Sequence, residues 1–358
     1  MFKMSGKPII SIFMGIMLVV TSCHLLDHDN RKPSVSVKDL KNGTGSLIDK
    51  GDFSGVMDIT RGMDSLFWLI YTISSPGNHP IMVASGKDDS WKDVWTIQPD
   101  NKSSVSIFNP RIWMDPDEKI WIFWTKQVKN VYEIWALTGD PGTNELVRSK
   151  PFFISDGILM GKPVLLSNGK FILSVGKDNK IQTIASFDHG KTWQHEGIVG
   201  LTDEISVNEA VCTITECMNG SLWMVIQTSK GTWESRSAEQ GMNWNGMVAS
   251  NITCADNPFF IQKLISGNIL LVKQVEALKA YISVDNGQTW SGELILDDNV
   301  HVSNITGHQI KDLLFPCCSE INIIFAIQKE NGKRIRMVSF TEDDVMTGKI
   351  RHYSSPFR

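Results

Sequence analysis

The chain has 358 residues, of which 42% are hydrophobic, and its net charge is −4, with 35 Lys and Arg against 39 Asp and Glu. This apolar content is sufficient for a large buried core. The basic residues are scattered along the sequence, so no cationic face for a phosphate backbone is expected and nucleic acid is excluded as a partner.

The first segment, residues 1–22, is typical of a lipoprotein signal peptide. Lys3 and Lys7 precede an apolar run of about 12 residues, too short to span a bilayer of ~30 Å as a helix. The run ends in Val-Thr-Ser-Cys, which places small residues directly before Cys23. We expect cleavage before Cys23 and lipid attachment to it, with no other contact between the chain and the membrane. An ordinary secretory signal is the alternative.

The segment that follows, residues 23–50, is polar and predicts a lipidated tether. Val35 and Val37 alternate there with serines, a pattern that favours one extra strand closing the last structural repeat. A lipidated Cys23 implies export across the inner membrane. We therefore expect the protein to be anchored, most naturally in the outer membrane, facing the periplasm or the cell surface.

The remaining cysteines do not predict a metal site. They show no CxxC spacing and no neighbouring histidines, and their number after Cys23 is odd; they are Cys212, Cys217, Cys254, Cys317 and Cys318. Pairing of Cys212 with Cys217 across a hairpin is conceivable, but buried free thiols are favoured. No cofactor is expected.

An internal repeat predicts the fold. SFDHGKTW starts at Ser186 and SVDNGQTW at Ser283, with degenerate copies SAEQGMNW at Ser237 and SGKDDSW at Ser85. The starts are separated by 101, 51 and 46 residues, and the first gap is two periods. Ser339 in MVSFTEDD stands one period after Ser283, and a strand near Thr138 fills the remaining gap, giving six copies.

A second series of strands supports this count. Short apolar runs rich in β-branched and aromatic residues recur about every 50 residues, at LFWLI, IWIFW, FILSV, LWMVI, ILLV and IIFAI. Two strand series in phase at this period are typical of propeller blades with four short strands. The fold class is therefore all-β, a six-bladed β-propeller over residues 51–347, followed by a C-terminal tail at 348–358.

The repeated SxDxGxTW turn, or Asp box, is expected to be structural. Asp188 can accept hydrogen bonds from the amides of its own turn, and Gly190 can adopt positive φ. Trp193 can then pack between blades. Because a catalytic residue does not normally recur once per blade, the box aspartates Asp188 and Asp285 are not catalytic candidates.

Together these motifs resemble the sialidase superfamily, in particular bacterial proteins with BNR repeats. The resemblance covers most of residues 57–347 and includes FNPRIWMDPDEKIWIFW, GILMGKPVLLSNGKFIL and NEAVCTITECMNGSLWMVIQ. Sialidases hold the sugar carboxylate with arginines, and a tyrosine activated by glutamate acts as nucleophile. An aspartate donates the proton to the leaving group. The resemblance implies an exo-glycosidase with a six-bladed propeller.

The resemblance assigns only part of that catalytic set to this chain. Glu209, in the NEA motif, matches the catalytic glutamate, and Glu216 is a second candidate nearby. Each is alternatively an exposed carboxylate at a strand end. Among the clamp arginines, Arg61 matches the first loosely, and Arg111 lies in a well-matched stretch without being at a recognised clamp position. Gln227 occupies the place of a further arginine.

Other expected groups are also replaced. Val275 stands near another clamp position, and Asn304 stands where the nucleophilic tyrosine should be. Tyr71 and Tyr281 lie in apolar strands and are interpreted as core residues. Lys162, in GILMGKP, either points into the central channel as a substrate-binding residue or is a solvated lysine before a turn.

The sequence therefore predicts a sialidase-like exo-glycosidase, with catalytic candidates Glu209 and Glu216 and substrate-binding candidates Arg61, Arg111, Lys162, Gln227 and Asn304. Hydrolysis of sialic acid itself is doubtful, and another linkage cleaved with Glu209, Glu216 or Asp58 stays open. The alternatives are a glycan-binding propeller without catalysis and a scaffold without a sugar ligand. A glycan is the expected partner, and a monomer is the expected state.

Overall fold

A computed structural model describes residues 37–39, 53–62, 66–73, 79–87, 90–98, 105–141, 147–201, 211–228, 230–252, 258–298, 301–309, 319–329 and 332–349. The predicted signal peptide, Cys23, Glu209, and the cysteines 254, 317 and 318 lie outside these residues. The described part belongs to one compact unit, Ser36–Ile350. Within it, no helix is long and apolar enough to cross a membrane.

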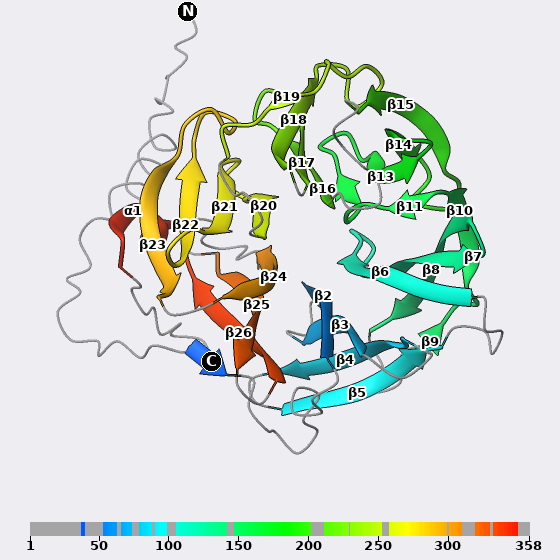
Figure 1. Ribbon diagram of the computed structural model, residues 1–358, viewed down its shortest axis with the longest axis horizontal. Helices are drawn as coiled ribbons and strands as arrows, with labels where there is room; N and C mark the ends of the chain where they lie inside the picture. Colours follow the sequence, from blue (N-terminus) through cyan, green and yellow to red (C-terminus); the bar gives the residue numbers. More distant parts are fainter. Residues whose placement is uncertain are drawn as a thin grey trace, which may run out of the picture. The chain divides into compact units, whose positions relative to one another are not determined.

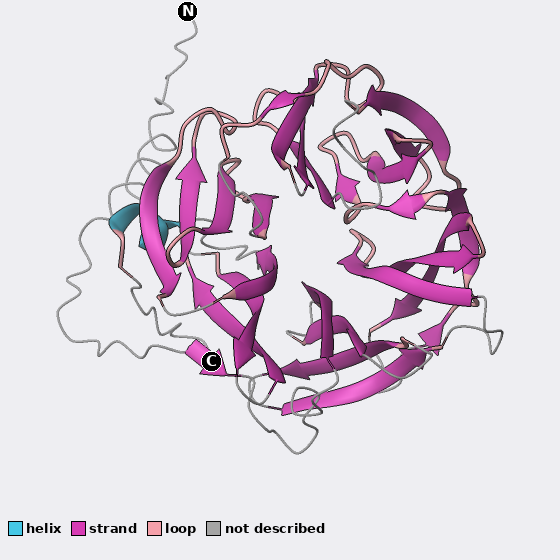
Figure 2. Cartoon of the chain, in the orientation of Figure 1, coloured by secondary structure: helices cyan, strands magenta, loops and turns pink. Residues whose placement is uncertain are grey.

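Six small antiparallel sheets are arranged in a ring, as Figures 1 and 2 show, which confirms the predicted six-bladed β-propeller. From the inner strand outward, blade 1 contains β2 (Phe53–Arg61), β3 (Phe67–Ile73), β4 (Ile81–Lys87) and β5 (Ser90–Ile97). Blade 2 contains β6 (Val105–Met114), β7 (Ile120–Val128), β8 (Val131–Asp140) and β10 (Phe152–Asp156), with β9 (Val147–Arg148) paired to β8. Blade 3 contains the inner segments β11 (Ile158–Leu159) and β12 (Val164–Leu165), then β13 (Phe171–Lys177), β14 (Lys180–Ser186) and β15 (Gln194–Gly200).

The second half of the ring repeats this order. Blade 4 contains β16 (Val211–Glu216), β17 (Leu222–Thr228), β18 (Gly231–Ser237) and β19 (Val248–Ala249). Blade 5 contains β20 (Phe259–Lys263), β21 (Ile269–Gln274), β22 (Leu278–Ser283) and β23 (Ser291–Asp297). Blade 6 contains β24 (Val302–Gln309), β25 (Ile321–Lys329), β26 (Gly332–Phe340) and, as its outer strand, β1 (Val37–Asp39). The extra closing strand predicted near Val37 is therefore present.

The core lies between neighbouring blades. The second strand of a blade is covered on both faces, as the burial of β3, β13 and β17 shows. A strand covered on both faces carries a continuous apolar run rather than an alternating one. This explains why the apolar runs of the second strands are the most regular signal in the sequence.

Each blade is antiparallel, so its second and fourth strands end on one side of the ring and its first and third strands end on the other. The box turns follow the third strands at this side. We call it the box face, formed by the turns Ser186–Trp193, Ser237–Trp244 and Ser283–Trp290 and by the short helix α1 (Glu342–Thr347). The opposite side, where the inner strands begin, is the loop face.

The box at Ser186 is a turn held by its own side chains. Ser186 Oγ accepts a hydrogen bond from the Gly190 amide at 2.7 Å, and Asp188 accepts from the amide and hydroxyl of Thr192 at 2.9 and 2.6 Å. These hydrogen bonds from Thr192 lower the pKa of Asp188 to about 2. Trp193 Nε1 donates to the Gly190 carbonyl at 3.1 Å. The aspartate therefore shapes the turn.

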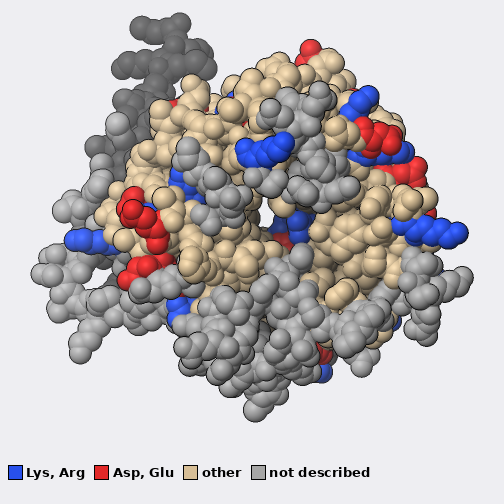
Figure 3. Space-filling view, in the orientation of Figure 1, with Lys and Arg blue, Asp and Glu red and all other residues tan. Residues whose placement is uncertain are grey.

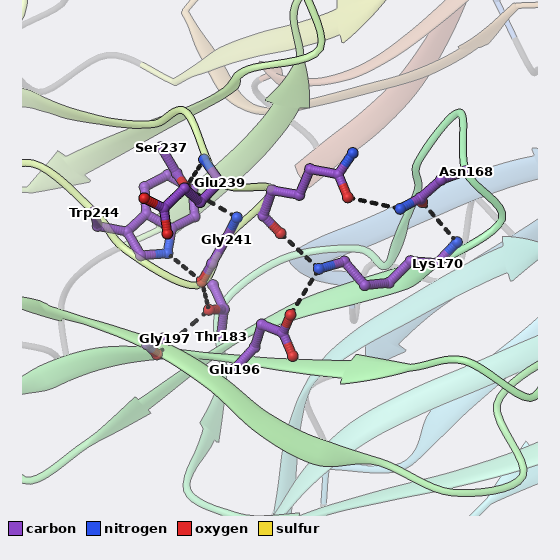
Figure 4. Close-up of polar contacts among 10 residues, drawn as sticks. Asn168, Lys170, Thr183, Glu196, Gly197, Ser237, Glu239, Gly241 and Trp244 are labelled. Carbon is purple, nitrogen blue, oxygen red and sulfur yellow. Dashed lines mark hydrogen bonds and ion pairs between the residues drawn. The ribbon is translucent and has the colours of Figure 1, made fainter.

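The degenerate box in blade 4 keeps most of this geometry. The Gly241 amide donates to Ser237 Oγ at 2.9 Å, and Trp244 Nε1 donates to the Gly241 carbonyl at 3.0 Å. The same turn joins blade 4 to blade 3, as Figure 4 shows, because Lys170 Nζ contacts both the Gln240 carbonyl at 2.7 Å and Glu196 Oε1 at 2.8 Å. A box that has lost its Asp still packs as a box.

Each box glycine lies against the second strand of the preceding blade. A Cβ added at these glycines would lie 2.5 Å from a side chain, with Gly190 against Trp121, Gly241 against Ile172 and Gly287 against Trp223. The three contacted residues are spaced by 51 positions, so the contact repeats with the blade. Glycine is required there for its positive φ and for this close approach.

Candidate functional site

A cavity of about 800 Å³ lies on the axis of the ring and is lined by the inner strands of all six blades. Figure 3 shows the hollow at the centre of the molecule, with basic and acidic side chains inside it. Ligand-binding cavities typically measure roughly 300–1,000 Å³. The lining combines aromatic groups with charged and amide groups, including Trp113, Phe259, Phe260, Gln262 and Lys263.

Asp58, on β2, is the most connected carboxylate in this cavity, and its side chain is only 2% exposed. Its Oδ1 accepts hydrogen bonds from Thr306 Oγ1 at 2.6 Å and from the Ile59 amide at 2.9 Å, and Oδ2 accepts from the Ile112 amide at 3.1 Å. Lys162 Nζ lies 2.7 Å from Oδ1. Asp58 of blade 1 thus contacts blades 2, 3 and 6.

Lys162 reaches Asp58 because the inner strand of blade 3 is interrupted. β11 ends at Leu159 and β12 begins at Val164, and both pair with β13. In the gap, Gly161 passes so close to the Cys212 carbonyl that a Cβ would lie 2.3 Å from it. Lys162 Nζ also donates to the Ile59 carbonyl at 2.7 Å. Of the two alternatives for Lys162, the side chain points into the channel.

Arg111, on β6, also lines the cavity and is not paired with a carboxylate among the described residues. Its one hydrogen bond there goes from Nη1 to the Pro110 carbonyl at 3.0 Å. Burial lowers the pKa of Arg111, and the negative charge of Asp58 opposes that shift. A guanidinium has several N–H donors in a planar fork, so most of its donors are directed to no acceptor in this part of the chain.

Glu216, at the box-face end of β16, is fixed by hydrogen bonds and by an ion pair. Both carboxylate oxygens accept from the Ser167 amide at 3.1 Å, Oε1 accepts from the Ser167 hydroxyl at 2.7 Å, and Lys263 Nζ lies 3.1 Å from Oε2. Burial would raise the pKa of Glu216, but the hydrogen bonds from Ser167 and the ammonium of Lys263 outweigh it, and the pKa is lowered. A carboxylate held in its ionised form is a poor proton donor.

Glu216 lies at the end of β16 that is farther along the chain from Glu209. Glu209 lies outside the described residues, two positions before β16 begins at Val211 on the loop face. Glu216 is the last residue of that strand. Because a strand rises about 3.3 Å per residue, Val211 and Glu216 lie roughly 17 Å apart along β16. Glu216 therefore lies at the box-face end of the channel.

Of the other predicted substrate-binding residues, some line the cavity and one does not. Gln227 and Asn304 line the cavity. Arg61 is not among its lining residues, and its guanidinium lies 4.8 Å from the centre of the Phe67 ring. Its charge still acts on the cavity, because burial, Lys162 and Arg61 together lower the pKa of His308 to about 3. His308 is therefore neutral.

Several cavity residues were not identified from the sequence. His308 and Lys263 belong to ordinary strand patterns and carry no motif. Their position at the inner strands of late blades is the only signal that could have identified them. Cys212 also lines the cavity, where burial raises the pKa of its thiol to about 12. Cys212 and Cys217 are both buried and free, as favoured from the sequence.

The chemistry of the described lining is incomplete for glycoside hydrolysis. Its two carboxylates, Asp58 and Glu216, are each paired with a lysine. No tyrosine is found among the described residues that line the cavity. No group of His, Cys, Asp and Glu in the described part of the chain could hold a metal ion. These residues can bind and orient a polar ligand.

Comparison with known proteins supports the assignment of the fold. Residues 77–306 match the BNR repeat-like domain. No curated protein matches the sequence. The NanB sialidase of Streptococcus pneumoniae superposes with a TM-score of 0.67 at 10% identity, over 88% of this chain and 72% of that chain.

Two further structures are similar at comparable levels. An α-L-arabinanase of Penicillium chrysogenum, in complex with arabinobiose, has a TM-score of 0.59 at 11% identity, over 87% of this chain and 100% of that chain. A protein of unknown function from Dyadobacter fermentans has a TM-score of 0.62 at 11% identity, over 82% and 95% of the two chains. At these identities the similarity establishes a shared fold.

Proposed function

This chain belongs to the BNR repeat-like domain family, and from that premise we propose that it is a sialidase-like exo-glycosidase. It would take a terminal sugar of an extracytoplasmic glycan into the axial cavity. The same fold serves the glycan-active sialidase and arabinanase, but a fold alone does not determine a function. The proposal therefore rests on the residues of the cavity.

Arg111 is the observation that carries the proposal. In the described lining three cations, Arg111, Lys162 and Lys263, face two carboxylates. Each lysine is paired with a carboxylate, and the imidazole of His308 is neutral, so the charge of Arg111 remains for a ligand. A planar guanidinium binds a carboxylate through two parallel hydrogen bonds. The preferred ligand is accordingly a sugar that bears a carboxylate.

Glu209 is the proposed catalytic residue. It precedes β16, whose first residue, Val211, lines the cavity at the loop face. A sugar held by Arg111 would present its glycosidic bond toward the loop face, where a glutamate can act as general acid or base. We retain Glu209 in this role and propose a structural role for Glu216.

A glycan-binding propeller without hydrolysis is the second candidate. It is favoured by one observation, that both described carboxylates of the cavity are engaged in ion pairs. Under this alternative the cavity keeps Arg111, Gln227 and Asn304 as binding groups, and the chemistry is absent. The ligand class is the same for the two candidates.

Detergent-solubilised full-length protein, incubated with aryl glycosides and with glycans ending in acidic or neutral sugars, separates the two candidates. The enzyme proposal predicts release of an acidic terminal sugar that Glu209→Gln abolishes while binding is kept. Binding of acidic glycans without release by the wild-type protein would establish the second candidate. Absence of both binding and release across the panel would reject both.

A further inference from the structure

A second cavity, of about 640 Å³, lies between blades 2 and 3 at the box face. It shares no lining residue with the axial cavity. Its walls come from the turn between β6 and β7 and from the box of blade 3, and Thr138 of β8 and Phe152 of β10 complete it. We call it the inter-blade pocket. Its volume falls within the range typical of ligand-binding cavities.

A contact that recurs between blades joins the two walls of this pocket. His189, the fourth residue of the box, has its Nδ1 2.9 Å from Asp117 Oδ2. In blade 4 the fourth box residue is Gln240, whose Oε1 accepts a hydrogen bond from Asn168 Nδ2 at 2.7 Å. Asp117 and Asn168 each lie three residues before the second strand of their blade. Asp117 is therefore engaged in packing between blades.

The pocket differs from the next interface in the state of one lysine. Lys119 and Lys170 both lie directly before a second strand. Lys170 is buried, and its ammonium contacts Glu196 Oε1 at 2.8 Å and the Gln240 carbonyl at 2.7 Å. Lys119 is exposed and lines the pocket, and its ammonium contacts no acceptor among the described residues. The same holds for the ammonium of Lys191, in the box wall.

The acidic groups of the pocket, in contrast, are already used inside the protein. Asp115 is buried, and its two carboxylate oxygens accept hydrogen bonds from the Lys119 amide at 2.8 Å and from Trp121 Nε1 at 2.7 Å. Asp117 is held by His189. Of the charged groups that line the pocket, the two ammonium groups are the ones left to meet a ligand, and they favour an anionic one.

We propose that the inter-blade pocket binds an acidic sugar unit of a glycan, with Lys119 and Lys191 contacting its carboxylate or sulfate group. The half-buried ring of Phe152, which packs edge-on against Trp121, offers an apolar surface to the sugar ring, and the Thr138 hydroxyl a hydrogen bond. This site is separate from the axial cavity and does not depend on glycan hydrolysis. A second site on the same molecule strengthens retention on a polymer that carries many acidic sugars.

Titration of detergent-solubilised full-length protein tests the proposal, with Arg111→Lys as the background so that the axial cavity contributes little. The probes are a uronic acid oligosaccharide, a sulfated oligosaccharide and a neutral oligosaccharide of equal length, and inorganic phosphate. We expect Lys119→Gln combined with Lys191→Gln to weaken binding of an acidic oligosaccharide by about tenfold. The matched control combines Lys180→Gln with Lys230→Gln, which removes the same charge from exposed positions outside both cavities. It should keep the affinity of the background protein.

Tighter binding of the uronate or of the sulfated probe supports the proposal and identifies the anionic group. Equal affinity of the pocket variant and the control variant, or equal binding of the neutral probe, would overturn it. Binding of phosphate as tight as that of the acidic oligosaccharides would also overturn it, because the sugar ring would then contribute nothing. No binding of any probe would have the same meaning. None of these measurements uses turnover, so failure of the proposed glycosidase activity is distinguished from failure of this site.

Discussion

Single residues in the axial cavity differ mainly in how their charges are compensated. Asp58 and Glu216 are each surrounded by hydrogen-bond donors and an ammonium group. Arg111 has one backbone carbonyl as its acceptor within the described residues. A partly buried charge without a close partner is costly unless a ligand compensates for it. The residues with the fewest internal contacts are therefore the ones expected to respond to ligand.

Arg111→Lys should weaken binding of an acidic glycan by roughly tenfold to a hundredfold, because lysine keeps the charge but loses the planar fork. Titration of ligand into the wild-type and variant proteins measures this. Arg148→Lys is the matched control, since Arg148 stacks on Trp95 outside the cavity. Equal affinity of the wild-type and Arg111→Lys proteins would show that Arg111 does not hold the ligand.

Glu216→Gln should leave turnover unchanged and lower the stability by about 1 kcal/mol at neutral pH, because Gln can still accept from Ser167 but loses the ion pair with Lys263. The pKa of Glu216 is lowered in the folded state. Its contribution to stability is thus present above the pKa of an unfolded glutamate and is lost as pH falls through the folded value.

Denaturant unfolding across this acidic range checks the prediction. The wild-type protein should lose more stability on acidification than Glu216→Gln, so the difference between the two should shrink. Lys263→Met is a companion variant that removes the same ion pair from the other side. Loss of turnover in Glu216→Gln at unchanged stability would instead assign a catalytic role to this carboxyl.

At the level of elements, the last residue of the inner strand connects blades 4 and 6 to the blade that precedes each. Glu216 accepts from the Ser167 amide, and at the equivalent position in blade 6 Gln309 accepts from the Ile265 amide at 2.7 Å. The neutral amide of Gln309 thus accepts the same kind of inter-blade hydrogen bond as the carboxylate of Glu216. Between blades 2 and 3 the donor position is occupied by Pro116, which has no N–H. This comparison supports the structural role of Glu216.

The box glycines make the strongest prediction about packing between elements. Gly190→Ala and Gly287→Ala should each destabilise the protein by roughly 2–3 kcal/mol, because both have φ near +80° and face a Trp ring at 2.5 Å. Gly246→Ala is the control, since no atom lies within 4 Å of its added Cβ. Thermal unfolding of the three variants is the measurement, and equal midpoints would contradict the close contact.

For the whole molecule, two buried carboxylates connect all six blades. Asp58 of blade 1 contacts Ile112 of blade 2, Lys162 of blade 3 and Thr306 of blade 6. Glu216 of blade 4 contacts blade 3 through Ser167 and blade 5 through Lys263. A ring whose sheets touch only their neighbours gains cooperativity from contacts that cross its axis.

The Asp58–Lys162 pair can be tested by a double-mutant cycle. Asp58→Asn and Lys162→Met should each cost about 3 kcal/mol, because each leaves a partner unpaired in a poorly hydrated site. The double variant should lose clearly less than the sum of the two. Denaturant unfolding gives the three values. Strict additivity would show that the pair does not stabilise the closed ring.

The sequence predicted the fold better than the site, and the reason is the range of the interactions involved. The box turn depends on residues within eight positions, as the Ser186–Trp193 contacts show. The hydrogen bond between Thr306 and Asp58 joins residues 248 positions apart. No local sequence pattern indicates a contact over this distance. The hydrogen bonds and ion pair of Asp58, and the ion pair of Glu216 with Lys263, could therefore not be predicted from the sequence.

The sequence by itself determined the number of blades, the positions of the second strands and the box turns, and it favoured a closing strand near Val37. These features follow from local hydrogen bonding and from burial that repeats with a fixed period. Only the tertiary structure decided which charges meet at the axis, because closing the ring brings β2, β6, β16 and β24 together from distant parts of the chain. That closure paired Lys162 with Asp58 and Lys263 with Glu216, and it left Arg111 with one backbone carbonyl as its acceptor among the described residues.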